Sequence, residues 1–126
     1  MIRWISYDEI ITFHGMLIDR TGGSHGVRDI SLIESAIAKA NATFDGVDLY
    51  PGRIEKIAAI TFALINNHGF VDGNKRIGIA VMELLLLYNK ISYKANDEEL
   101  IELGLGIAAG RVDECGLREW LENHIK

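Results

Sequence analysis

The residues best suited to chemistry stand together in a nine-residue segment that begins at His68 and ends at Arg76. A histidine accepts a proton near neutral pH, which makes His68 a candidate general base. The carboxylate of Asp72 offers the hard oxygen ligands that Mg²⁺ prefers. Lys75 and Arg76 add cationic donors that bind phosphate. A base, a metal ligand and an anion-binding group so close together predict attack on a phosphate of a nucleotide.

The second half of the segment also contains the expected start of a helix, at Asn74. The first turn of a helix has unpaired amides and the positive end of the helix dipole, so it favours an anion. Lys75 and Arg76 are repelled by that positive end, and a bound phosphate explains why two cations lie there. We therefore expect a phosphate site at this helix start.

Each of these residues also has a purely structural explanation. The imidazole of His68 could bond the last carbonyls of the preceding helix. Asp72 could be the N-cap of the following helix, a role that is compatible with metal binding at another stage. Lys75 and Arg76 could form ion pairs with Glu83 or Asp72. The occurrence of all four in one segment favours the chemical interpretation.

Helices are the elements that must position this segment. Residues Arg53 to Asn67 and residues Asn74 to about Tyr88 are nearly apolar on every side. Such stretches are typical of helices that are buried all round. The segment is therefore expected to connect two central helices of an all-helical fold.

Capping pairs and apolar stripes predict further helices around this pair. The capping pairs are Ser6 with Glu9, Ser31 with Glu34, and Asn96 with Glu99. A last helix carries an apolar stripe made of Leu117, Trp120, Leu121 and Ile125. His14 falls in the apolar stripe of the first helix, and we expect it to be a hydrogen-bonded histidine of the core.

The segments that connect the predicted helices have weaker sequence signals. Three glycines predict a flexible turn after the first helix: Gly22, Gly23 and Gly26. Residues 43–50 are expected to form a loop, and Pro51 to be an early residue of the next helix. Lys90 to Tyr93 could form a brief extended piece.

Composition limits what kind of protein this is. With 126 residues, the chain is expected to form one domain, residues 1–126. The net charge of −5 argues against a protein that mainly binds nucleic acid, because such binding needs a basic surface. A single cysteine, Cys115, suits a reducing compartment. The longest apolar stretch, Ile77 to Leu87, reaches only about half of a membrane span, so we expect a soluble, cytoplasmic protein without membrane attachment.

The nine-residue segment resembles the signature of the Fic/Doc family, His-x-Phe-x-Asp/Glu-Gly-Asn-x-Arg, at every fixed position. Two other stretches are similar to the death-on-curing (Doc) branch of that family, Val27-Arg28-Asp29 and Ala108-Ala109-Gly110. The resemblance thus spans nearly the whole chain. It implies a compact all-helical bundle of about six helices, in which the motif loop and the central buried helix after it form the nucleotide site.

The resemblance also implies a role for each motif residue. His68 would be the general base that deprotonates a hydroxyl group of the target, and Phe70 would anchor the loop in the core. Asp72 would bind the Mg²⁺ ion that bridges the phosphates of ATP. The phosphate-binding residues, through backbone amides or side chains, would be Gly73, Asn74, Lys75 and Arg76.

Two positions favour transfer of phosphate over transfer of AMP. Members that transfer AMP have a glycine where this chain has Lys75, and an arginine where it has Ile79. Doc-type proteins share the lysine and lack that arginine, and they resemble kinases that move a γ-phosphate. Lys75 would then be catalytic, because it stabilises charge on the transferred group.

The expected function is therefore that of a Doc-like toxin, which transfers the γ-phosphate of ATP to a hydroxyl group of a protein. By resemblance the target is a translation factor, elongation factor Tu, whose modification halts protein synthesis. The alternatives are transfer of AMP and a catalytically silent Fic fold that acts as a binding partner.

Inhibition is expected to come from a second protein. Many Fic enzymes carry an inhibitory helix with Ser/Thr-x-x-x-Glu, whereas no Ser or Thr of this chain is followed by Glu four positions later. We therefore predict an antitoxin that acts in trans, with a disordered segment that folds as an amphipathic helix into a groove of this protein.

Overall fold

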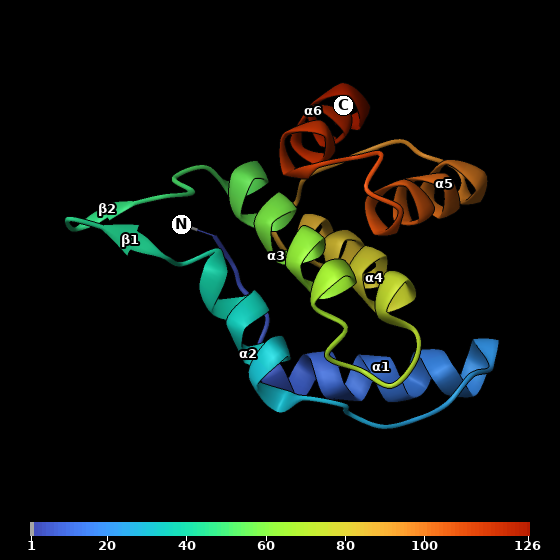
Figure 1. Ribbon diagram of the computed structural model, residues 1–126. Coiled ribbons are helices and arrows are strands. Elements are labelled where there is room, and N and C mark those ends of the chain that lie inside the picture. The colour runs from blue at the N-terminus through green and yellow to red at the C-terminus, as the bar shows by residue number, and fades with distance from the viewer. Residues whose placement is uncertain (1) are drawn as a thin grey trace.

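The computed structural model describes residues 2–126, which form six helices and one short hairpin (Figure 1). The helices are α1 (Tyr7–Thr21), α2 (Ile30–Lys39), α3 (Arg53–Asn67), α4 (Asn74–Tyr88), α5 (Asp97–Ala108) and α6 (Glu114–His124). The strands β1 (Thr43–Phe44) and β2 (Val47–Asp48) pair antiparallel. The prediction of a helical bundle of about six helices is confirmed.

Helix α3 forms the centre of the fold. It contacts α2, α4, α5 and α6, and nine of its fifteen residues are buried. Helix α4 packs against α3 and also contacts α1 and α5 (Figure 1). The bounds predicted for both central helices agree with the structure. The burial expected on every side is wrong for α4, in which six of fifteen residues are buried and Leu87 is 71% exposed. Because they pack against each other, the two helices are a rigid support for the loop that joins them.

Helices α3 and α4 pack tightly against each other at Gly78. A Cβ atom at this position would lie 2.4 Å from Cγ1 of Ile65 and 3.4 Å from the carbonyl oxygen of Thr61. Both of these α3 residues are buried. Only a glycine therefore allows this separation of the two helices.

The helix starts are mostly those expected. The capping boxes of Ser6 with Glu9 and Asn96 with Glu99 are both present. The one expected at Ser31 is wrong, because Asp29 is the N-cap of α2. The carboxylate of Asp29 accepts both the amide of Ser31, at 3.0 Å, and its hydroxyl, at 2.6 Å. The serine hydroxyl is thus already used as a donor and does not cap the helix.

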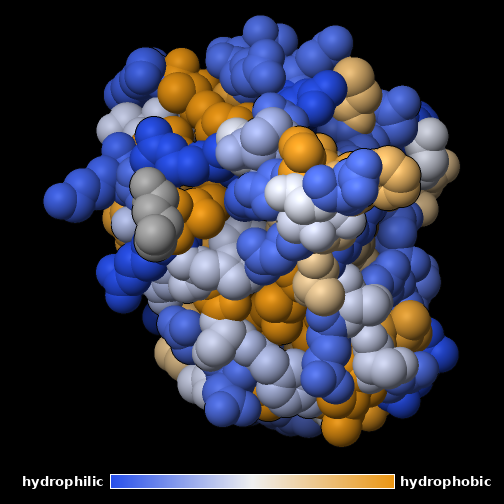
Figure 2. Space-filling model, turned by 90° about the vertical axis from the view of Figure 1, so that its left-hand side faces the viewer, coloured by the Kyte–Doolittle hydropathy of each residue, from blue (hydrophilic) through white to orange (hydrophobic). Residues whose placement is uncertain are grey.

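The connection between α2 and α3 differs from the expectation in two ways. Pro51 lies before the helix, because Gly52 is the N-cap and α3 begins at Arg53. The expected loop contains the β1–β2 hairpin, whose turn is made by Asp45 and Gly46, both with positive φ. An Asp-Gly pair favours this tight turn. The hairpin projects from the helices (Figure 1), and the face on this side has hydrophobic patches among polar residues (Figure 2).

The end of the chain returns to the segment that follows α4. Of the extended piece expected over Lys90 to Tyr93, only Tyr93 is paired, in an isolated antiparallel bridge with Ile125, whereas Lys90 lies in a turn with φ 57°. His124 links the two C-terminal helices, because its Nε2 lies 3.0 Å from the carboxylate of Glu99. Within residues 2–126, no helix combines the length and the apolar character needed to cross a membrane.

Candidate active site

The segment from His68 to Arg76 connects α3 to α4 and includes the first turn of α4. It borders a pocket of about 190 Å³, to which α5 contributes Ala108. All the residues singled out from the sequence line this pocket: His68, Asp72, Gly73, Asn74, Lys75 and Arg76. The structure therefore brings the expected base, metal ligand and phosphate-binding residues together.

His68 is the residue that ends α3. Its backbone has φ 53° and ψ 47°, the left-handed conformation that is costly for a residue with a Cβ atom. The side chain is exposed at the pocket, and within residues 2–126 no group hydrogen-bonds its imidazole. The imidazole does not bond the last carbonyls of α3, so the structural explanation considered for it is wrong. The ring is placed where it can accept a proton from a ligand.

The carboxylate of Asp72 is held on both of its oxygens. Oδ2 accepts the amide of Ser24 at 3.1 Å, and Oδ1 accepts the amide of Gly73 at 2.8 Å. These two bonds are the main reason why the pKa of Asp72 is lowered, and the guanidinium of Arg76, 3.6 Å from Oδ1, contributes further. Asp72 is therefore ionised at neutral pH. The N-cap of α4 is Gly73, with φ 78°, so the expectation that Asp72 caps this helix is wrong.

The surroundings of Asp72 fit a magnesium ion. Within residues 2–126, no three His, Cys, Asp or Glu side chains come together as a metal site. Mg²⁺ does not need such a cluster, because it usually binds one or two carboxylates together with water and substrate phosphates. Each oxygen of Asp72 accepts one amide and keeps a further lone pair. The carboxylate can therefore bind a cation without giving up its main-chain contacts.

The start of α4 offers backbone donors to a phosphate. The first hydrogen bond within the helix runs from the amide of Ile77 to the carbonyl of Gly73, at 2.9 Å. The helix itself therefore leaves unpaired the amides of Asn74, Lys75 and Arg76. The amide of Gly73, which was expected to bind phosphate, donates to Asp72 in this structure. The amides available to a phosphate are therefore those of Asn74, Lys75 and Arg76, without that of Gly73.

The side chains of Asn74 and Arg76 hold the motif loop in place. Asn74 bonds both backbone groups of Phe70: its Oδ1 accepts the amide at 3.0 Å and its Nδ2 donates to the carbonyl at 3.1 Å. Arg76 donates to the hydroxyl of Thr21 at 2.5 Å and to the carbonyl of Gly22 at 2.7 Å. Contacts of these two side chains with phosphate stay a prediction.

Helix α1 supports the motif loop through His14. This buried histidine stacks on Phe70, with ring centroids 3.8 Å apart, and its Nε2 lies 2.7 Å from the carbonyl oxygen of Asp72. A carbonyl can only accept, so Nε2 must carry the proton. Phe70 itself is 2% exposed, as expected of the residue that anchors the loop. The prediction of a hydrogen-bonded core histidine is confirmed.

The glycine-rich segment after α1 lies directly against the motif loop. A Cβ atom on Gly23 would be 2.5 Å from Oδ2 of Asp72, and the carbonyl of Gly26 accepts the amide of Val71 at 3.0 Å. Val27 and Phe70 form an antiparallel bridge. Sequence reasoning predicted only a flexible turn here and missed these contacts. The glycines were the available signal, because Gly23 and Gly26 both have positive φ and a Cβ atom on Gly23 would collide with the Asp72 carboxylate.

Lys75 borders two hollows at once. It is exposed, and it lines both the motif pocket and an apolar groove of about 460 Å³ between α1, α4 and α5. Ile79, one helical turn later, lies in the same groove. A Cβ atom on Gly104 of α5 would be 3.4 Å from Cγ1 of Ile79. The groove beyond Lys75 is therefore mostly apolar on the side of Ile79.

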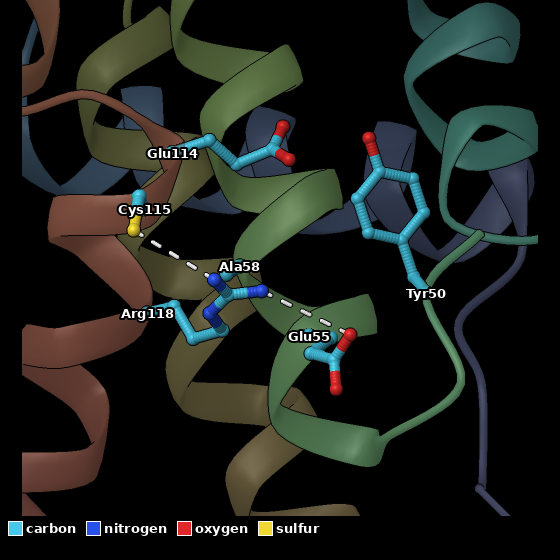
Figure 3. Close-up of a pocket in the computed structure, with 6 residues that line it drawn as sticks. All are labelled: Tyr50, Glu55, Ala58, Glu114, Cys115 and Arg118. Atoms are coloured by element: carbon cyan, nitrogen blue, oxygen red, sulfur yellow. Dashed lines mark hydrogen bonds and ion pairs between the residues drawn. The ribbon is translucent and has the colours of Figure 1, made fainter.

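A third hollow, of about 100 Å³, lies at the other end of α3, between α3 and α6 (Figure 3). Arg118 of α6 donates to the sulfur of Cys115 at 3.7 Å and lies 3.9 Å from the carboxylate of Glu55. Tyr50 closes the hollow from the segment before α3. None of these residues belongs to the motif segment, so this hollow is separate from the candidate active site.

Comparisons with known proteins match this arrangement to a family. Residues 4–86, which include the whole motif segment, match the Fic/DOC family. Toxin Doc of Mycolicibacterium smegmatis is 34% identical over 96 residues, which cover 76% of this chain and 72% of that protein. Protein kinase doc of Escherichia phage P1 is 29% identical over 123 residues, or 95% of this chain and 94% of that protein. The chain therefore belongs to the Fic/Doc family.

Proposed function

We propose that this chain is a Doc-like toxin of a toxin–antitoxin module, and that it transfers the γ-phosphate of ATP to a hydroxyl group of a protein. One observation carries the proposal: a candidate base, an ionised carboxylate and an exposed lysine line the same pocket at the start of a helix. The names of the two relatives, a toxin and a protein kinase, support the toxin role and the transferred group.

In the proposed reaction, His68 accepts the proton of the target's hydroxyl group. The hydroxyl oxygen forms a bond to the γ-phosphorus while the bond from that phosphorus to the β-phosphate oxygen breaks, and ADP leaves. Lys75 donates to the oxygens of the transferred group and stabilises their charge. Mg²⁺ bound by Asp72 and the phosphates would supply neutralisation of the phosphate charge. The unpaired amides at the start of α4 orient the same phosphate.

Ile79 supports transfer of phosphate over transfer of AMP. To transfer AMP, the α-phosphate must lie beside His68, and the other two phosphates then need a cation farther along α4. Ile79 stands one turn beyond Lys75, in an apolar groove against α5. An apolar side chain cannot neutralise phosphate charge, so we favour a nucleotide bound with its γ-phosphate beside the base.

The experiment that tests this proposal uses ATP labelled at either end of its phosphate chain. The purified protein is incubated with Mg²⁺, a cytosolic extract or isolated elongation factor Tu, and ATP labelled at the γ- or the α-phosphate. We expect γ-label and a mass increase of one phosphate on the target, and no transfer by His68→Ala. Transfer of α-label would instead establish AMP transfer. Binding of ATP without transfer of either label would indicate a catalytically silent binding partner.

We also propose that an antitoxin inhibits this protein in trans. The apolar groove between α1, α4 and α5 exposes Ile101 and Leu105, which are 61% and 42% exposed. Lys75 and Arg76 lie at the edge of the same groove. An amphipathic helix of the antitoxin, with acidic residues toward those cations, would fill the groove. It would cover Lys75 and thereby block the nucleotide site.

A further inference from the structure

We propose that Arg28 is a positioning residue for the general base, because it holds the backbone of His68 in its left-handed conformation. Arg28 lies in the segment between α1 and α2, forty positions before His68. The inference rests on the proposed function, since it assumes that His68 accepts a proton from the target.

Three successive carbonyl groups at the end of α3 accept hydrogen bonds from Arg28. Its Nε donates to the carbonyl of His68 at 2.7 Å, and its Nη2 donates to that of Asn67 at 3.4 Å. Its backbone amide donates to the carbonyl of Gly69 at 2.8 Å. The last carbonyls of a helix have no partner within the helix, and a cation there is favoured by the helix dipole. Arg28 thus caps α3 from a different part of the chain.

His68 needs such a cap more than most residues do. Helices often end in the left-handed conformation at a glycine, because a Cβ atom makes this conformation unfavourable. Here the residue with φ 53° is the histidine itself. The charge-assisted bond from Arg28 holds its carbonyl and opposes relaxation to another backbone conformation. A relaxed backbone would carry the imidazole away from the pocket.

The position of Arg28 distinguishes the positioning of His68 from a role in the core or in nucleotide binding. Its side chain is exposed, so its removal takes nothing from the core. Arg28 is also absent from the residues that line the motif pocket, within the described part of the chain. We therefore expect it to act on the base and not on the nucleotide. Displacement of a catalytic group by about 1 Å can lower a rate roughly a hundredfold.

The chain offers a matched control in Arg53. This exposed arginine donates from Nη1 to the carbonyl of Asn89, the residue that caps the C-terminus of α4, at 3.1 Å. The bond is of the same kind as that of Arg28, but it lies at the end of α3 opposite to the motif loop. Loss of either arginine should therefore lower stability by a similar amount, while only one bond supports His68.

The test compares Arg28→Ala, Arg28→Lys and Arg53→Ala with the unaltered protein. We expect Arg28→Ala to lower kcat roughly ten- to a hundredfold with an almost unchanged KM for ATP. Lysine should restore part of kcat, because it keeps the charge but cannot present two donors in fixed directions. The backbone ¹³C chemical shifts of His68 should leave left-handed values in Arg28→Ala alone. Arg53→Ala should keep both kcat and these shifts.

An Arg28→Ala variant with full kcat would overturn the inference, and so would an equal loss of kcat in Arg53→Ala. The proposed function fails separately, if the unaltered protein transfers no phosphate. Even then the chemical shifts test the contact itself, because unchanged shifts of His68 in Arg28→Ala would show that Arg28 does not hold its backbone.

Discussion

The ionised state of Asp72 is set by main-chain donors. The amides of Ser24 and Gly73 lower its pKa most, and Arg76 adds to the effect. In the unfolded chain the carboxylate takes up its proton near pH 4, while in the folded state it keeps its charge to lower pH. The stabilisation is therefore present above pH 4 and is lost as the pH falls through the lower folded pKa. Asp72→Asn should thus lose less stability in acid than the unaltered protein, measured by urea unfolding from pH 6 downward.

The control for this measurement is Asp45→Asn, at the exposed turn of the hairpin. It should follow the acid dependence of the unaltered protein. If Asp72→Asn follows it as well, the amides of Ser24 and Gly73 do not favour the charged carboxylate as the geometry indicates.

His14 gives a second prediction at the residue scale. His14→Phe keeps an aromatic ring against Phe70 but leaves the carbonyl of Asp72 without its donor. An unsatisfied buried acceptor costs about 1–3 kcal/mol, so the free energy of unfolding should fall by that amount in a denaturant titration. His25→Ala is the control, because His25 pairs with Asp19 on the surface, and such pairs contribute at most about 1 kcal/mol. Equal stability of both variants would argue against a structural role for the His14 bond.

At the scale of elements, substitution of two helical glycines by alanine should change the free energy of unfolding in opposite directions. Gly15 of α1 has open space where the methyl group of an alanine would lie, whereas Gly78 of α4 has none, because Ile65 and Thr61 fill it. Gly15→Ala should raise the free energy of unfolding by about 0.5–1 kcal/mol, since alanine is the better helix former. Gly78→Ala should lower it by about 1–3 kcal/mol, because the methyl group would overpack the α3–α4 contact. Thermal unfolding of both variants measures the difference, and stabilisation by Gly78→Ala would contradict the close packing.

The same elements show where local sequence patterns are sufficient to predict the bounds of a helix. The apolar character of residues 53–67 and 74–88 predicted α3 and α4 with their observed bounds. A stretch that is apolar on nearly every side favours a helix with most of its surface packed, which describes α3 well and α4 less well, because Leu87 of α4 is 71% exposed. The start of α2 was misplaced because two nearby residues, Asp29 and Ser31, can each cap a helix. The hairpin was not predicted because each of its strands has only two residues, too few for an alternating pattern.

At the scale of the whole molecule, the motif could be located from the sequence, but its supports could not. The residues of the motif are neighbours in the chain, so their types and spacing already indicate a site. The groups that hold them come from elsewhere: His14 from α1, Ser24 and Arg28 from the segment before α2. Each of these contacts has a backbone group as one of its two partners, and every residue possesses backbone groups. A local sequence pattern therefore carries no mark of them.

The proposed antitoxin interface gives the last prediction, which concerns the molecule together with its partner. Ile101→Glu places a charge on the lining of the apolar groove, at an exposed position that the core does not need. A charged side chain there would have to be desolvated beneath the antitoxin helix, so affinity should fall about tenfold or more. Catalytic transfer of phosphate should stay unchanged, because Ile101 lies outside the motif pocket.

Val47→Glu is the matched control, because Val47 is an equally exposed apolar residue on the hairpin, away from the groove. Binding of the antitoxin to each variant can be measured by calorimetry, and growth of cells that co-express the two proteins reports inhibition. Cells with Ile101→Glu should grow more slowly than cells with the unaltered protein despite the antitoxin, because the active site stays intact while its inhibitor binds more weakly. Cells with Val47→Glu should grow. If the antitoxin binds and neutralises Ile101→Glu as it does the unaltered protein, its helix occupies another surface.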